Sequence, residues 1–178
     1  MIFAKTRITN VWVVEPERHE DERGFFARTW DTHEFAERGL NNRLVQSSVS
    51  YNAKQGTLRG LHYQEAPHEE AKLVRCTSGG IFDVAVDLRP DSRTFGHWFG
   101  VELWAANRLA LYVGEGCAHG FLTLTDDAEV LYQMSEFWAP AAGRGVRWDD
   151  PAFAIEWPGE VMIINERDRT YPDFEAPT

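Results

Sequence analysis

The chain has 178 residues, 43% of them hydrophobic, which is enough to bury the core of one domain. Twenty-eight acidic residues against eighteen basic ones give a formal net charge of −10, which argues against nucleic acids and anionic membranes as partners. No stretch approaches eighteen consecutive apolar residues and the first residues do not follow the pattern of a signal peptide, so we expect a cytoplasmic protein. A local group of arginines remains compatible with a small phosphorylated ligand.

Short apolar runs at 11–15, 72–76, 81–88, 99–104, 109–113, 120–124 and 129–134 predict strands. Turn signals lie between them at 89–92, 105–108, 114–116 and 125–128. These connections are too short for crossover helices, which predicts antiparallel pairing in a sandwich or barrel. Within 81–88, alternation predicts one buried face with Phe82, Val84, Val86 and Leu88, and Asp83 and Asp87 on the other face.

One peripheral helix is predicted at 31–40, with Asp31 or Thr32 as N-cap, Glu34 in the first turn and Gly39 at its end. The polar segment 164–178 is expected to wrap the surface. Because no linker or repeat interrupts the sequence, we expect a single domain over 1–178. Cys76 and Cys117 are too few for a disulfide framework and fit no metal-ligand spacing, so we expect small buried thiols.

The segment 57–64, TLRGLHYQ, brings together a cation, a glycine and a histidine. Strand alternation predicts Arg59 and Leu61 on one face and Gly60, His62 and Gln64 on the other. The later segment 114–121, GEGCAHGF, resembles the second half of the cupin signature, which places a histidine, here His119, inside a small barrel.

Metal-binding cupins carry a His-x-His pair in their first motif, which here reads His62-Tyr63-Gln64. With the second histidine absent we expect no tightly held metal and no cofactor, and His62 is free to accept a proton.

Three other residues are candidates whose local context leaves two interpretations open. Lys72 shares a strand face with Val74 and Cys76, and it is either a site residue or a surface lysine. Tyr132 is either a barrel-interior hydroxyl or a buried core tyrosine. Asp168 lies between two arginines in NERDR, a context more typical of a surface ion pair.

Eight segments follow one another in chain order and span nearly the whole chain. They are DERGFF (21–26), GTLRGLHYQ (56–64), KLVRC (72–76), IFDVAVDLRPDSRTFG (81–96), EGCAHGFLTL (115–124), EVLYQ (129–133), GVRWDDPAFAIEWP (145–158) and NERDR (165–169). Together they resemble the dTDP-4-dehydrorhamnose 3,5-epimerase family, a metal-independent branch of the cupins. The resemblance implies a mainly β protein, a cupin-type antiparallel jelly-roll β-barrel with short peripheral helices, acting on a nucleotide-diphosphate sugar.

The resemblance also implies catalytic roles. His62 removes a proton beside a C4 ketone and Asp168 orients its imidazole. Lys72 places positive charge near the enolate oxygen, an effect worth roughly 3 kcal/mol. Tyr132 returns a proton from the opposite face of the ring, as a phenol protonated at pH 7 can. His119 is expected to bind the substrate rather than to act as a second base.

Further positions are implied to bind the nucleotide. Arg23, Gln46, Arg59 and Arg167 are expected near the diphosphate and sugar, and Trp138 replaces the usual tyrosine that stacks on the base. Departures from the family pattern are Arg28 and Gly143 in place of acids, Ser47 and Ser48 in place of an acid and an asparagine, and Gly114 and Cys117 in place of proline and phenylalanine. They leave open the nucleotide and whether C3, C5 or both are inverted.

The alternatives are a keto-isomerase acting on a similar nucleotide sugar, a metal-dependent cupin dioxygenase and a non-catalytic sugar-binding cupin. Family members are typically dimers that exchange strands or N-terminal arms. We therefore expect a homodimer, with the apolar segment 1–14 as the exchanged part.

Overall fold

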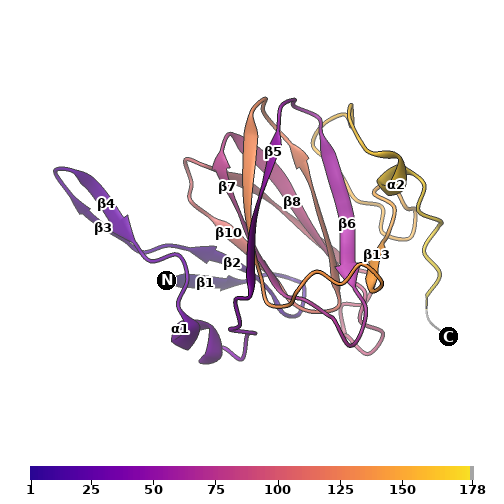
Figure 1. The fold of residues 1–178 in the computed structure, drawn as a ribbon, viewed down its shortest axis with the longest axis horizontal. Helices are drawn as coiled ribbons and strands as arrows, with labels where there is room; N and C mark the ends of the chain where they lie inside the picture. Colours follow the sequence, from indigo (N-terminus) through magenta and orange to yellow (C-terminus); the bar gives the residue numbers. More distant parts are fainter. Residues whose placement is uncertain (177–178) are drawn as a thin grey trace.

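The computed structural model describes residues 1–176 and consists mainly of two antiparallel sheets that face each other (Figure 1). The first sheet has the order β1 (Ile2–Lys5), β2 (Val11–Glu15), β10 (Ala110–Val113), β7 (Lys72–Ser78), β12 (Ala128–Met134) and β5 (Gln46–Asn52). The second has the order β13 (Gly143–Gly145), β6 (Leu58–Gln64), β11 (Cys117–Thr123), β8 (Gly80–Asp87) and β9 (Trp98–Trp104).

The main core lies between these sheets. Its first-sheet members include Val11, Val74, Leu111 and Val130, and the second sheet contributes residues such as Phe121. Each fills the interior because alternate residues of a strand point to the same face. The predicted antiparallel jelly-roll β-barrel with short peripheral helices is confirmed, and both cysteines are free and buried, as expected.

The prediction of one buried face for 81–88 is wrong, since both faces of β8 are covered. Asp83 and Asp87 are fully buried on the interior side. On the other side Val84 and Val86 pack with Phe153 and with side chains from the C-terminal segment. A polar residue on a strand therefore does not mark solvent when the interior of the barrel itself holds polar groups.

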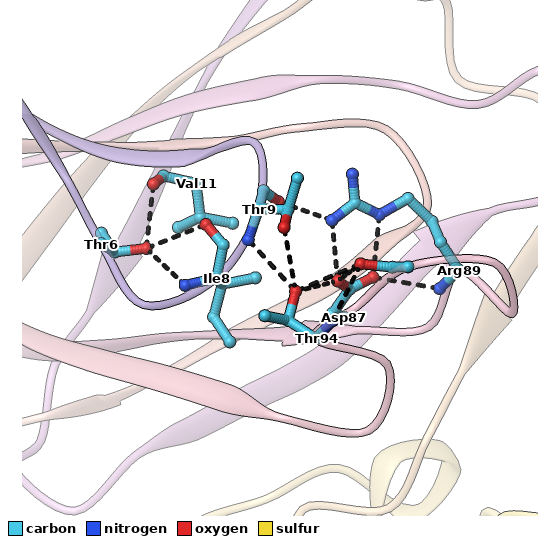
Figure 2. Close-up of polar contacts among 8 residues, drawn as sticks. Thr6, Ile8, Thr9, Val11, Asp87, Arg89 and Thr94 are labelled. Carbon is cyan, nitrogen blue, oxygen red and sulfur yellow. Dashed lines mark hydrogen bonds and ion pairs between the residues drawn. The ribbon is translucent and has the colours of Figure 1, made fainter.

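Asp87 joins two loops at one end of the barrel (Figure 2). Its carboxylate accepts hydrogen bonds from Arg89, Ser92 and Thr94, and the hydroxyl of Thr94 also accepts one from the backbone N–H of Thr9 in the β1–β2 turn. Burial alone would raise the pKa of Asp87, but these hydrogen bonds lower it below the usual value. The network stabilises the barrel and is separate from the chemistry described below.

The exchange of segment 1–14 with a second chain stays a prediction. Within one chain this segment forms β1 and β2, which pair with each other, and β2 also pairs with β10. The hairpin of β3 (Arg18–Asp21) and β4 (Gly24–Ala27) projects instead, away from the two sheets (Figure 1). Its tip region exposes Phe25 and Phe26, the latter 73% accessible.

The predicted helix begins as expected but is shorter. Asp31 caps α1 (Thr32–Ala36) by accepting from the N–H groups of His33 and Glu34. The chain leaves the helical conformation before Gly39, whose φ of +68° suits a residue without a side chain. The second helix, α2 (Glu166–Arg169), lies beside β6. Neither helix of the described residues combines the length and apolarity that crossing a membrane would take.

Candidate active site

The predicted catalytic side chains gather between the two sheets. His62 comes from β6 and His119 from β11, whereas Lys72 and Tyr132 come from β7 and β12 of the facing sheet. They line two adjoining cavities of about 370 Å³ and about 260 Å³, and both cavities contain His62, Lys72 and Tyr132. The topology thus places groups from two sheets on opposite sides of one space.

His62 forms a hydrogen-bonded pair with Asp168, the residue whose local sequence favoured a surface ion pair. The distance from His62 Nε2 to Asp168 Oδ1 is 2.7 Å, and Asp168 Oδ2 accepts from the Gly60 N–H at 3.0 Å. The Asp168 side chain is fully buried, while that of His62 is 40% exposed toward the cavity. Burial would raise the pKa of Asp168, but the hydrogen bonds from His62 and Gly60 lower it. An ionised carboxylate therefore holds an accessible imidazole.

Backbone pairing brings α2 to β6. The N–H of Leu58 donates to the carbonyl of Ile163 at 2.8 Å, and the Met162 N–H donates to Gly56 O at 2.9 Å. Asn165 then caps α2, accepting from the Asp168 N–H at 2.7 Å. This short anchored segment therefore brings Asp168 to His62, although the two residues lie more than a hundred positions apart in the sequence.

A β-bulge in β6 overturns the predicted alternation of Arg59 and Leu61. His119 pairs with His62, but Phe121 pairs with Arg59, so β6 has one extra residue between the two pairs. Arg59 therefore lines the cavity with His62, while Leu61 packs in the outer core. Gly60 allows the bulge, since its φ is +123° and an added Cβ would lie 2.6 Å from the Cα of Gly120.

Lys72 is buried, so the surface-lysine interpretation is wrong. Its Nζ lies 2.8 Å from Glu70 Oε1 and 3.4 Å from the carbonyl oxygen of His62. The side chains of Lys72 and Glu70 are 10% and 9% exposed. The cation is thus held at the cavity wall beside the catalytic strand.

Tyr132 projects into the interior, where its ring meets that of His119 edge-on at 5.8 Å. Burial raises the pKa of Tyr132, and the nearby Asp83 raises it further, so the hydroxyl stays protonated. His119 forms a second pair through Nε2, 2.7 Å from Asp83 Oδ1. Burial raises the pKa of Asp83, whose other oxygen has no hydrogen-bond partner among the described residues.

Most of the predicted substrate-binding residues join this site. Gln46, Ser48, Trp138 and Arg167 line the larger cavity, and Arg59 and His119 the smaller one. Ser47 does not, because it alternates with its neighbours on β5, and its hydroxyl donates to the Tyr132 carbonyl at 3.1 Å. Sequence reasoning missed five lining residues, which are Ser50, Glu70, Met134, Arg144 and Asn165.

Arg23 and Arg28 lie outside this cavity. Arg23 is in the turn of the projecting hairpin, 84% exposed, and pairs with Asp21. Arg28 follows the hairpin, is 61% exposed and pairs with Asp31. Neither residue lines the cavity of its own chain, so the expected substrate contacts of both residues stay predictions.

A larger cavity of about 550 Å³ lies elsewhere, around the β1–β2 turn. Its lining, which includes Lys5, Arg38 and Arg89, contains no histidine, tyrosine or carboxylate that could move a proton. Size therefore does not identify the active site here. Within residues 1–176, no three histidine, cysteine or acidic side chains converge as a set of metal ligands, and the expected independence from metals stays a prediction.

Comparison with known proteins gives a consistent result. The family model described as dTDP-4-dehydrorhamnose 3,5-epimerase matches residues 5–176. An enzyme of that name from Methanothermobacter thermautotrophicus is 46% identical over 173 residues, covering 95% of this chain and 92% of the relative. The solved structure of such an epimerase from Elizabethkingia anophelis matches with a TM-score of 0.95 at 40% identity, covering 98% of this chain and 96% of that one.

Two further solved structures carry ligands. The Bacillus anthracis dTDP-4-dehydrorhamnose 3,5-epimerase, with TDP and PPi bound, matches with a TM-score of 0.92 at 39% identity, covering 97% of this chain and 99% of that one. A 3'-monoepimerase from Streptomyces bikiniensis in complex with dTDP-quinovose matches with a TM-score of 0.87 at 34% identity, covering 96% and 86%. The same fold thus occurs in proteins described as double and as single epimerases.

Proposed function

The chain belongs to the dTDP-4-dehydrorhamnose 3,5-epimerase family, and we propose that it inverts C3, C5 or both in a dTDP-linked 4-keto-6-deoxy sugar without a metal or other cofactor. The observation that carries this proposal is the accessible His62–Asp168 pair, which faces the same cavity as a protonated tyrosine on the opposite sheet. Inversion needs a base and an acid on opposite faces of the sugar ring, and this arrangement supplies both.

His62 is the base in this mechanism. Asp168 accepts the hydrogen on Nε2, which leaves Nδ1 with a free lone pair to remove a proton beside the C4 ketone. Asp168 also stabilises the imidazolium that forms, since its lowered pKa keeps it ionised. The electron pair from the C–H bond moves into the ketone and gives an enolate.

Lys72 stabilises that enolate and Tyr132 completes the inversion. A buried ammonium near the developing oxygen charge lowers the barrier, because few water molecules screen it. The Tyr132 hydroxyl donates its proton to the carbon from the other face. His119, held by Asp83, contacts the sugar and positions it without removing a proton.

The nucleotide extends along the two adjoining cavities that contain His62, Lys72 and Tyr132. Arg59 and Arg167 donate to the diphosphate, and Gln46 and Ser48 contact the sugar or the diphosphate. Trp138, a residue that is 52% exposed and lines the larger of these two cavities, stacks its indole on the base.

We also propose a homodimer in which the β3–β4 hairpin of one subunit reaches the cavity of the other. The hairpin has no contact with its own cavity and exposes Phe25, Phe26 and Arg23. This arrangement would restore the expected substrate contacts of Arg23 and Arg28. A light-scattering mass of one chain at micromolar concentration would contradict it. We further propose that the chain forms a single domain and that the protein is cytoplasmic.

The test of function is incubation with dTDP-4-keto-6-deoxyglucose in D₂O, followed by NMR. We expect deuterium at C3 and C5, or at one of them for a single epimerase, together with an inverted product. Tyr132→Phe is expected to retain exchange at carbon while losing inversion by about 10²-fold. A product with a moved carbonyl would indicate a keto-isomerase, and no exchange with any nucleotide sugar would end the catalytic assignment.

A further inference from the structure

Gly143 lies against the indole of Trp138 and leaves no room for a side chain. A Cβ built on Gly143 would be 2.5 Å from Cη2 of Trp138, closer than real contacts allow, and 3.1 Å from Cζ3, which is a tight contact. The backbone does not require glycine here, since Gly143 sits in β13 and is not among the glycines with positive φ. A side chain at this position would therefore collide with the indole where it now lies.

The segment that carries Trp138 is held by two glutamines. The Oε1 atom of Gln46 accepts a hydrogen bond from the backbone N–H of Trp138 at 2.7 Å. Gln64 is 1% exposed; its Oε1 accepts from the Ala139 N–H at 2.7 Å and its Nε2 donates to the Phe137 carbonyl at 3.2 Å. Since the backbone on both sides of Trp138 is fixed, a side chain at 143 must displace the indole and not the segment.

We propose that Gly143 determines how this protein binds the nucleotide, because its missing side chain lets the Trp138 indole take the position that stacks on the base. The indole lines the cavity of about 370 Å³ that contains His62, together with Arg144 and Arg167. A flat apolar ring beside cations suits the base of a nucleoside diphosphate. This inference rests on the proposed function. It adds a residue that contacts the stacking indole of Trp138 rather than the ligand.

The first test is Gly143→Ala, with dTDP as the probe in calorimetry. Loss of one stacked base weakens binding by about tenfold, and the KM for the sugar nucleotide should rise by a similar factor. The matched control is Gly159→Ala, whose added Cβ would meet only Leu122 at an ordinary 3.7 Å. It should leave both values unchanged. Thermal unfolding of each variant checks that the chain remains folded.

The second test repeats Gly143→Ala in a Trp138→Phe background. Phenylalanine lacks the outer ring atoms that meet the added Cβ, so the same change should now alter dTDP affinity by less than about twofold. Equal losses in both backgrounds would overturn the inference, as would unchanged affinity of Gly143→Ala alone. If the unmodified protein does not bind dTDP, the nucleotide assigned in the proposed function fails. If the unmodified protein binds dTDP and Gly143→Ala binds it equally well, only the present inference fails, which separates the two claims.

Discussion

The barrel holds two histidine–aspartate pairs that look alike and differ in surroundings. His62 and His119 are direct partners on neighbouring strands, and each places Nε2 2.7 Å from an aspartate oxygen. The His62 side chain is 40% exposed and that of His119 is 4% exposed. The same two residue types can therefore serve proton transfer in one place and substrate positioning in the other.

The pKa values of the two aspartates are shifted in opposite directions. Asp168 gains a second donor, the Gly60 N–H, and its pKa is lowered although burial opposes this. Asp83 has one oxygen without a partner, and burial raises its pKa. The two histidine–aspartate distances are the same, so distance does not distinguish the pairs. The proton-transfer pair differs from the substrate-positioning pair in its access to the cavity and in the complete hydrogen bonding of its carboxylate.

The largest effect should come from Asp168→Asn. An asparagine amide donates to the imidazole, which reverses the tautomer and places hydrogen on the nitrogen that must remove the substrate proton. We expect kcat to fall by about 10³-fold. Steady-state turnover of the sugar nucleotide measures it. Asp83→Asn is the matched variant and should lower kcat by less than about tenfold, so comparable losses in both variants would refute the distinction between the pairs.

Lys72 lines the same cavity as both histidines and should have the next largest effect. Lys72→Met keeps much of the buried volume but removes the charge near the enolate, and we expect kcat to fall by about 10²-fold. The control is Lys54→Met, because Lys54 is 65% exposed and pairs only with Asp126. A Lys72 variant with normal turnover would remove this residue from the mechanism.

The smallest effects concern stability against pH, with opposite signs for the two aspartates. Since the folded pKa of Asp168 is lowered, its contribution is present above the unfolded pKa of about 3.9 and is lost as pH falls through the folded value. The folded pKa of Asp83 is raised, so this carboxyl group favours the folded state at low pH. Its contribution to stability is lost as pH rises from the unfolded pKa through the folded pKa of Asp83.

Melting temperatures between pH 3 and 7 test this. Asp168→Asn should lose less stability than the parent on acidification, whereas Asp83→Asn should remove part of the loss that occurs as pH rises from the lower end. Shifts of the same sign in both variants would contradict the assigned surroundings of the two carboxylates.

Much of this site could be predicted from the sequence. His62, Lys72, Tyr132 and Asp168 do meet, because they fall in motifs of a family whose order is kept along the chain. Apolar periodicity located the strands whose side chains fill the interior between the sheets. It could not reveal the bulge at Gly60, because a register shift depends on the partner strand, and so Arg59 was placed on the wrong face.

Other errors have different physical causes. Ser47 could have been excluded, since Gln46 and Ser48 already occupy the cavity side of an alternating strand. The strand β5 is mainly polar, so it has no apolar alternation from which a strand could be predicted. The location of Arg23 depends on the hairpin of β3 and β4, which projects away from the two sheets (Figure 1), and the local sequence does not show where such a hairpin points.

The most direct test compares His62→Asn with His119→Asn in the D₂O experiment. We predict that His62→Asn abolishes deuterium incorporation into dTDP-4-keto-6-deoxyglucose, whereas His119→Asn retains incorporation at saturating substrate with a raised KM. Retained exchange in the His62 variant would contradict the account. Loss of exchange in the His119 variant alone would also contradict it and would indicate that the buried pair supplies the base.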